Sequence, residues 1–174
     1  MSELEDFRRE KDELFAKDRH SPLTPAQRRA FKGLQYFPEN PELRLEVEVE
    51  QLPEQETVEM QTSSGTVQRY TRAGKFKFNV EGQEAELTLF TDSHGFFLPF
   101  ADALAGQETY GAGRYLEPQQ LPDGRLLVDF NYAYNPYCAY NDAWTCPLTP
   151  FENRLKTPIR AGEKIPEGDW VEHE

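Results

Sequence analysis

Hydrophobic residues near the start of the chain recur with the period of an α-helix. Four of them fall on one helical face, interrupted at Lys11: Leu4, Phe7, Leu14 and Phe15. The pattern predicts a helix over residues 3–17, opened by a capping box of Ser2 and Glu5. A second, short helix is predicted over residues 25–32, because a proline occupies its first position and a glycine follows its last.

From residue 42 onward the hydrophobic period changes to two. Apolar and charged side chains alternate in LRLEVEVE, residues 43–50, which is typical of a strand with one buried face. The turns EGQE and LPDGR predict β-hairpins, and the second of them would pair residues 114–118 with residues 125–134. Other alternating stretches predict strands over residues 56–62, 66–72, 76–80 and 85–89, and a short strand or buried loop over 95–100.

This series of short strands predicts a mainly β fold. Turns at intervals of about 8 to 12 residues are typical of an antiparallel sandwich or a partly open barrel, here with an N-terminal helical segment packed on it. At 174 residues the chain is most simply one domain. We expect N-terminal helices over residues 1–33 and a β-sheet core over 42–134. Prolines then preclude long regular elements, so residues 135–174 are expected to be a Pro-rich C-terminal loop region packed on the sheet.

The charge balance narrows the range of partners. Acidic residues outnumber basic ones by 31 to 19, which gives a formal charge of −12. Such a chain repels phosphate backbones and anionic lipid surfaces, so no nucleic-acid partner is expected. No stretch is long and apolar enough to cross a bilayer, and the charged N-terminus lacks the apolar part of a signal peptide. We therefore expect a cytoplasmic protein with no membrane partner, whose acidity serves solubility.

Both cysteines of the chain, Cys138 and Cys146, lie in the stretch NPYCAYNDAWTC. A disulfide is disfavoured in a reducing cytoplasm. Seven residues separate the thiols, a spacing unlike that of structural zinc sites, so no metal is predicted. A catalytic thiolate would need a base, and His94 is the only central histidine. The favoured interpretation is two buried thiols that pack as small hydrophobes, followed by a redox-switchable pair.

Polar side chains crowd into the region around the second predicted hairpin. Arg114 would lie on its first strand and pair with Asp129 on its second, and Asn131 would share a face with Asp129. From the residues alone, an ion pair that holds the hairpin is favoured over a fork that recognises a carboxylate or phosphate. Aromatic residues surround the thiols and are expected mainly to pack; alternatively, two or three of them line a small-molecule cleft: Tyr132, Tyr134, Tyr137, Tyr140 and Trp144.

Several blocks of the chain resemble one known family. The blocks YFPENPELR, LPFADALAGQETYGAGRYL, DFNYAYNPYCAY, TCPLTPFENRL and IRAGEK are similar to the successive signatures of domain-of-unknown-function family 1684, and the resemblance spans nearly the whole chain. It implies that six positions carry characteristic residues of the family: Arg114, Asp129, Asn131, Cys138, Cys146 and Glu152. The chain departs at Tyr137 and Thr149, where the family pattern more often has proline. The resemblance implies no activity and no cofactor, because the family has no established one.

Together these observations favour a cytoplasmic protein that binds a small anionic molecule near residues 125–152. Arg114 would anchor the anion, Asn131 and Asn135 would orient the ligand, and Tyr134 would line the pocket. Asp129 would position Arg114. The reactive group, if the protein is an enzyme, would be the thiol of Cys138 or the carboxylate of Glu152. The alternatives are a non-enzymatic structural or protein-interaction module and a thiol-based redox sensor. The cofactor and the oligomeric state stay open.

Overall fold

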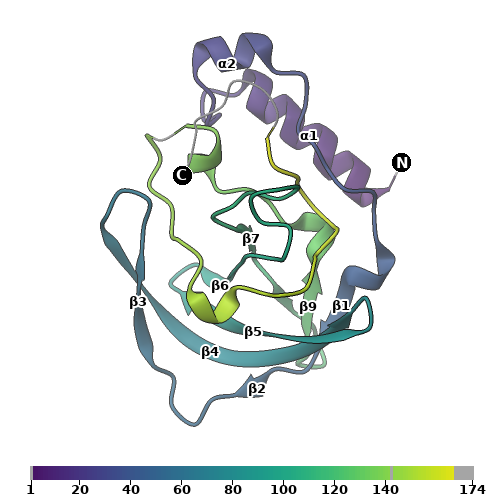
Figure 1. Cartoon of the computed structure of the whole chain (residues 1–174), viewed down its shortest axis with the longest axis vertical. Helices are drawn as coiled ribbons and strands as arrows, with labels where there is room; N and C mark the ends of the chain where they lie inside the picture. The colour runs from purple at the N-terminus through teal and green to yellow at the C-terminus, as the bar shows by residue number, and fades with distance from the viewer. Residues whose placement is uncertain (1, 142, 167–174) are drawn as a thin grey trace.

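Antiparallel strands and two N-terminal helices make up the structure, a computed structural model that describes residues 2–141 and 143–166 (Figure 1). The α-helices are α1 (Glu3–Lys17) and α2 (Pro25–Ala30). The strands are β1 (Arg44–Val47), β2 (Glu50–Gln51), β3 (Thr57–Gln61), β4 (Val67–Val80), β5 (Gln83–Asp92), β6 (Gly95–Phe100), β7 (Arg114–Leu116), β8 (Gln119–Gln120) and β9 (Leu126–Asp129). Single 3₁₀ turns are η1 (Pro41–Leu43), η2 (Phe130–Tyr132), η3 (Tyr137–Ala139) and η4 (Phe151–Asn153).

The strands form two sheets. The larger has the order β2-β4-β5-β6-β7, with β3 also paired to β4, and the smaller has the order β1-β9-β8. Every pairing between these strands is antiparallel. The predicted mainly β, antiparallel class with an N-terminal helical segment is therefore confirmed. Across the described residues, the sheets do not close into a barrel.

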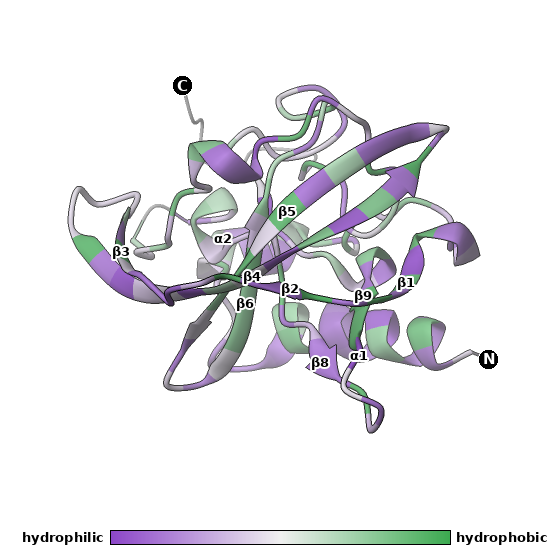
Figure 2. Cartoon of the chain, turned by 90° about the horizontal axis from the view of Figure 1, so that it is seen from below, coloured by the Kyte–Doolittle hydropathy of each residue, from purple (hydrophilic) through white to green (hydrophobic). Residues whose placement is uncertain are grey.

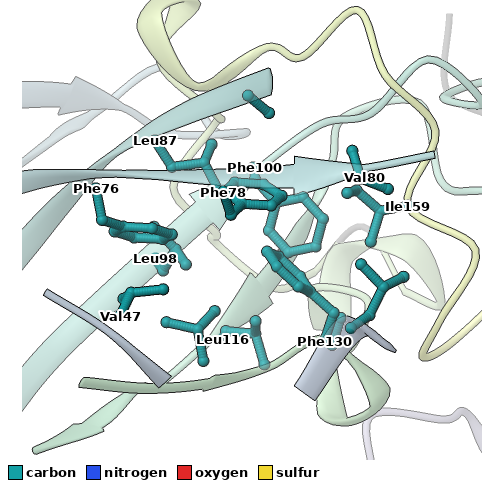
Figure 3. Close-up of a cluster of buried hydrophobic side chains, with 14 of the residues drawn as sticks. Val47, Phe76, Phe78, Val80, Leu87, Leu98, Phe100, Leu116, Phe130 and Ile159 are labelled. Atoms are coloured by element: carbon teal, nitrogen blue, oxygen red, sulfur yellow. The ribbon is translucent and has the colours of Figure 1, made fainter. Parts of the chain in front are cut away.

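The main hydrophobic core lies between the two sheets. Apolar side chains of β4, β5 and β6 meet those of β1 and β9. Figure 3 labels ten residues of this core, which come from β1, β4, β5, β6, β7, η2 and the C-terminal segment. Phe130 of η2 joins this core, with its ring centroid 5.4 Å from that of Phe78 and 5.1 Å from that of Phe100. Each such buried aromatic or aliphatic side chain contributes about 1.5–3 kcal/mol. The hydrophobic residues of β4 and β5 can face this core on one side because they alternate with hydrophilic residues along both strands, as Figure 2 shows.

The two longest strands, β4 and β5, form the predicted hairpin. Its tight turn places Glu81 and Gly82 at positive φ. Glycine at the second of these positions adopts that conformation without strain. The two strands predicted over residues 66–72 and 76–80 are one continuous strand, because a register shift between Arg72 and Gly74 absorbs one extra residue. Gly74 is needed there, since a Cβ would lie 2.7 Å from the carbonyl oxygen of Glu50 on β2.

The second predicted hairpin is confirmed only in part. An isolated antiparallel bridge joins Tyr115 to Tyr134, within the two predicted stretches, but the regular strand pairing differs. β7 pairs with β6 of the larger sheet, and it is the two-residue β8 that pairs with β9. Pro118 lies between β7 and β8 and cannot donate a ladder hydrogen bond, which favours a break where the chain passes from one sheet to the other. The expected strand over residues 125–134 also ends early, at Asp129, whose side chain caps η2.

The N-terminal helix follows its predicted bounds. The Ser2 hydroxyl accepts a hydrogen bond from the Glu5 N–H group, and Leu4 and Phe15 are buried. The second helix ends at Ala30, two residues before the predicted end, because Phe31 is already extended. The interruption of the apolar stripe at Lys11 also has a cause. Lys11 Nζ forms an ion pair with the carboxylate of Glu163, whose side chain is only 2% exposed.

The Lys11–Glu163 pair is expected to hold α1 against the sheet. Lys11→Met keeps most of the aliphatic stem but leaves a buried carboxylate without its cation, so we expect a loss of about 3 kcal/mol in the free energy of unfolding. Urea denaturation measures it. The matched control is Lys17→Met at the exposed end of α1, which should change stability by less than about 0.5 kcal/mol. Adding Glu163→Gln to Lys11→Met should restore part of the loss; an additive double variant would contradict the coupling.

Candidate functional site

Arg114, the predicted anion anchor, is enclosed by the protein itself. Its guanidinium donates hydrogen bonds to three backbone carbonyls of the C-terminal segment: those of Ile159 (3.0 Å), Ala161 and Glu163 (3.0 Å). Its charge partner is Asp102 at 4.0 Å, not Asp129, so the predicted Arg114–Asp129 pair is wrong. The Arg114 side chain is 1% exposed, and burial lowers its pKa to about 10, with Asp102 opposing that shift.

Asp129 and Asn131 lie together, but not on one strand face. The Asp129 Oδ1 atom accepts hydrogen bonds from the backbone N–H (3.0 Å) and the side-chain amide (2.9 Å) of Asn131. The buried Asn131 side chain also exchanges two hydrogen bonds with the backbone of Asn40, which ties the loop before β1 to η2. The other Asp129 oxygen, Oδ2, has Arg44 Nε as its nearest cation, at 4.0 Å.

Asn135 belongs to a buried network around Glu163. Its backbone N–H donates to Glu163 Oε1 (2.9 Å), and its side-chain amide donates to the Tyr140 hydroxyl (3.1 Å) and the carbonyl of Lys164 (2.9 Å). The Asn135 side chain therefore serves internal contacts. Tyr134 lies at the surface side of this network, held by two backbone hydrogen bonds to Tyr115, and its hydroxyl donates to the Glu117 carboxylate.

Glu152 lies apart from the other predicted site residues. Its carboxylate is bound by Arg72, with Arg72 Nη2 at 2.7 Å from Oε1, and by the Thr88 hydroxyl, at 3.0 Å from Oε2. These contacts border a separate depression of about 330 Å³ between β3 and the chain around η4. Neither cysteine borders that depression, so the structure does not combine the two groups that were predicted as reactive.

The two thiols lie in contact. The Cys138 N–H group donates to Cys146 Sγ at 3.4 Å, and the Tyr110 hydroxyl lies 4.0 Å from Cys138 Sγ. Both cysteines are buried, and no disulfide joins them. His94 is not beside them as a base, since its side chain is 90% exposed and faces Asp92. Across the described residues, no group of three or more His, Cys, Asp and Glu side chains is arranged to hold a metal ion.

The contact makes the two thiols unequal. The Cys138 S–H group and the backbone N–H groups of residues 138 and 137 donate to Cys146 Sγ, which lowers the pKa of Cys146 to about 7 against the opposing effect of burial. The pKa of Cys138 is raised, first by its hydrogen bond to Cys146 and then by burial. Cys146 is thus the thiol that ionises first.

Two adjoining hollows lie between α1 and the β-sheet region. We call the first the thiol pocket; its volume is about 440 Å³, and it is lined by Phe7, Lys11, Tyr115, Tyr134, Pro136, Tyr137, Thr145, Cys146 and Pro147. We call the second the helix–sheet cavity; its volume is about 570 Å³, and it is lined by Glu3, Phe7, Arg44, Leu116, Glu117, Pro118, Gln119, Leu127, Val128, Asp129, Tyr132 and Tyr134. Phe7 and Tyr134 border both hollows.

The residues that α1 supplies to these hollows, Glu3, Phe7 and Lys11, were not among the predicted site residues. The polar interruption of its apolar stripe at Lys11 was the available signal, since a cation in the middle of a buried helix face needs a partner. Glu3 and Glu117 carried no comparable signal, because exposed glutamates are common along this acidic chain.

These features define the class as a mainly β protein in which an N-terminal helix covers two hollows beside a pair of antiparallel sheets. The sequence model of the family described as "Protein of unknown function (DUF1684)" matches residues 29–164, and the chain belongs to that family. The resemblance drawn from the sequence is therefore confirmed.

Among solved structures, the chain is similar to the solution NMR structure of an uncharacterized protein from Haloarcula marismortui. The two share 40% sequence identity with a TM-score of 0.68, and the match covers 92% of this chain and 91% of the other. No curated protein matches the chain. Within the described ranges, no helix combines the length and apolarity that a membrane crossing requires.

Arg114 is expected to stabilise the fold. Arg114→Ala leaves three carbonyls and Asp102 without their buried cation, so we expect a loss of about 3–5 kcal/mol in the free energy of unfolding, measured by urea denaturation. The control is Arg154→Ala on the exposed side of the loop, which should cost less than about 0.5 kcal/mol. Equal effects of the two substitutions would show that Arg114 is not a structural residue.

Cys146 should be alkylated at lower pH than an ordinary thiol. Because the thiolate is the reactive form and the pKa of Cys146 is about 7, its rate with iodoacetamide should rise as pH increases through 7. Peptide mass spectrometry across pH 5–10 follows each cysteine separately. Cys138→Ala removes the S–H donor and should move the profile to higher pH, while Cys138→Ser keeps a donor and should move it less. A profile for Cys146 centred near that of a free thiol would refute the assignment.

Proposed function

We propose that this protein binds a small organic cation, a molecule carrying an ammonium group, in the helix–sheet cavity. The observation that carries the proposal is the set of charges around that cavity. Three carboxylates line it, those of Glu3, Glu117 and Asp129, against the single cation of Arg44. A hollow with this imbalance attracts a positive ligand.

Arg44 compensates these carboxylates weakly. Its side chain is 54% exposed, and the 4.0 Å separation from Asp129 Oδ2 is at the limit of an ion pair. Asp129 Oδ2 therefore keeps the capacity to accept a hydrogen bond from a ligand. Its Oδ1 atom is already engaged by Asn131, which holds the carboxylate in place.

Aromatic rings supply the second kind of contact for an ammonium group. The ring centroids of Phe7 and Tyr132 lie 5.0 Å apart in an edge-to-face arrangement, and Tyr134 joins them at the junction with the thiol pocket. Burial raises the pKa of Tyr132, as do the nearby carboxylates of Asp129 and Glu3, so its phenol stays neutral. Aromatic faces attract ammonium groups by about 0.5–1 kcal/mol at exposed sites and more in desolvated ones. Apolar side chains of β7 and β9 add surface for the rest of the ligand.

The proposal keeps the predicted region but changes the predicted ligand. Tyr134, which was predicted to line the pocket, and Asp129, which was predicted to position Arg114, both line the cavity. Arg114, Asn131 and Asn135 make internal hydrogen bonds instead, so the basis for an anionic ligand weakens. Under this proposal Asp129 acts on the ligand directly, not through Arg114.

Ammonium probes test the proposal by NMR. The ¹H–¹⁵N spectrum of the full chain is titrated with tetramethylammonium chloride and with butylammonium chloride, at an ionic strength matched by sodium chloride. We expect saturable shifts at the amides of residues 116, 117, 119 and 127–134, weakened by added salt. Sodium acetate and sodium phosphate are titrated in parallel. Shifts in this region with the anions and none with the ammonium probes would support the original anionic ligand and defeat the cation proposal.

Isosteric variants supply the control. Asp129→Asn and Glu117→Gln remove one negative charge each, yet keep acceptors for Asn131 and Tyr134. Each should weaken binding by roughly three- to tenfold, at most about 1.4 kcal/mol. Glu59→Gln on β3, outside the cavity lining, removes the same charge and should leave affinity unchanged. Equal weakening by all three substitutions would indicate that the ammonium probe responds to the net charge of the protein and not to this cavity. If the probes do not bind the unmodified protein at all, the alternative of a non-enzymatic structural module is favoured.

A further inference from the structure

We infer that Cys138 and Cys146 form a hydroperoxide-reactive dithiol, in which Cys146 is oxidised first and Cys138 closes the disulfide. The inference is independent of ligand binding in the helix–sheet cavity. It starts from the contact between the two residues, with the Cys138 N–H group 3.4 Å from Cys146 Sγ. Two thiols brought together in a folded chain can form a disulfide after a small approach of the sulfur atoms.

The surrounding fold holds both cysteines in place. Cys138 lies in η3, packed in a hydrophobic cluster with Phe15 and Tyr140. Cys146 is fixed from the other side by the turn between β3 and β4: its N–H group donates to Ser63 Oγ at 3.1 Å, and its carbonyl accepts from Ser63 N at 2.9 Å. The pair is thus a product of tertiary structure, since one partner is bound to a turn about eighty residues away.

Access distinguishes the two thiols. Cys146 borders the thiol pocket, about 440 Å³ in volume and open to solvent, whereas Cys138 does not border it. Cys146 is 7% exposed and Cys138 is 2% exposed. The hydrogen bonds that Cys146 receives stabilise its thiolate, the nucleophilic form. An oxidant that enters the thiol pocket therefore meets Cys146 before Cys138, and Cys146 is the cysteine with the lower pKa.

The reaction balances with a hydroperoxide as the oxidant. The Cys146 thiolate attacks the terminal peroxide oxygen; the O–O bond breaks, an S–O bond forms, and the leaving alkoxide or hydroxide takes up a proton. The Cys138 thiol then attacks the sulfur of the sulfenic acid. The S–S bond forms, the S–O bond breaks, and water leaves with the proton of Cys138. Overall, two thiols lose two electrons and two protons, and the hydroperoxide becomes an alcohol, or water, plus one further water.

The position of Cys138 suits the second step. It is buried behind Cys146, where solvent and external thiols compete poorly for the sulfenic sulfur. While Cys146 is a thiolate, its charge opposes ionisation of Cys138. Conversion of that thiolate to a neutral sulfenic acid removes this repulsion, so Cys138 becomes easier to ionise only after the first step.

Intact-mass measurement of the full chain tests the inference. The reduced protein, freed of reductant, is treated with a few equivalents of hydrogen peroxide. We expect a loss of about 2 Da, one peptide linking residues 138 and 146, and full reversal by dithiothreitol. Retention of both free thiols, or disulfides formed only between chains, would overturn the inference.

Single-cysteine variants test the order of the steps. Cys146→Ala should slow the consumption of peroxide at least tenfold. Cys138→Ala should still react and should accumulate a sulfenic acid at Cys146 that dimedone traps. Cys146→Ser and Cys138→Ser serve as second variants where an alanine does not fold, as judged by the ¹H–¹⁵N spectrum. Loss of reactivity in the Cys138 variants with retention in the Cys146 variants would reverse the assigned roles and contradict the inference.

Discussion

The buried guanidinium of Arg114 is the interaction on which the rest of this structure depends. It binds the carbonyl groups of Ile159, Ala161 and Glu163, in a C-terminal segment with little regular structure of its own. Three charge-assisted hydrogen bonds compensate for removing the guanidinium from water and fix the path of that segment. In Figure 1 the yellow C-terminal segment runs past β7, which begins at Arg114. The same segment carries Glu163, whose carbonyl is one of the three groups that Arg114 binds.

Glu163 connects the C-terminal segment to the N-terminal helix. Its carboxylate accepts hydrogen bonds from the Asn135 backbone and the Tyr140 hydroxyl, and it pairs with Lys11 of α1. Buried charge in this arrangement selects one docking position for the helix, because any other leaves a carboxylate unpaired in the interior. Both hollows described above have a wall formed by α1, so their shapes follow from the same chain of contacts.

The two hollows differ in chemistry although they share Phe7 and Tyr134. The helix–sheet cavity gathers carboxylates, while the thiol pocket has Lys11 and the Cys146 thiol at its wall. Solubility alone therefore does not explain where all of the acidic residues lie. Glu3 and Glu117 come from elements far apart in the sequence and meet beside Asp129 only in the folded protein. Solubility would not require them to converge on one hollow.

Local sequence patterns were enough to predict α1 with its capping serine, the β4–β5 hairpin and the mainly β class, because periodicity and turn residues act over short distances. Of the candidate residues that the sequence suggested, Asp129 and Tyr134 line the helix–sheet cavity, and Cys146 borders the thiol pocket. The interaction partners of the charged residues and of the thiols depend instead on the tertiary structure. Arg114 pairs with Asp102, since Pro118 interrupts the expected hairpin and β7 joins the other sheet. Which thiol is accessible depends on Ser63 and on the walls of the thiol pocket. Charges and thiols act through space, and their neighbours come from distant segments that no local pattern specifies.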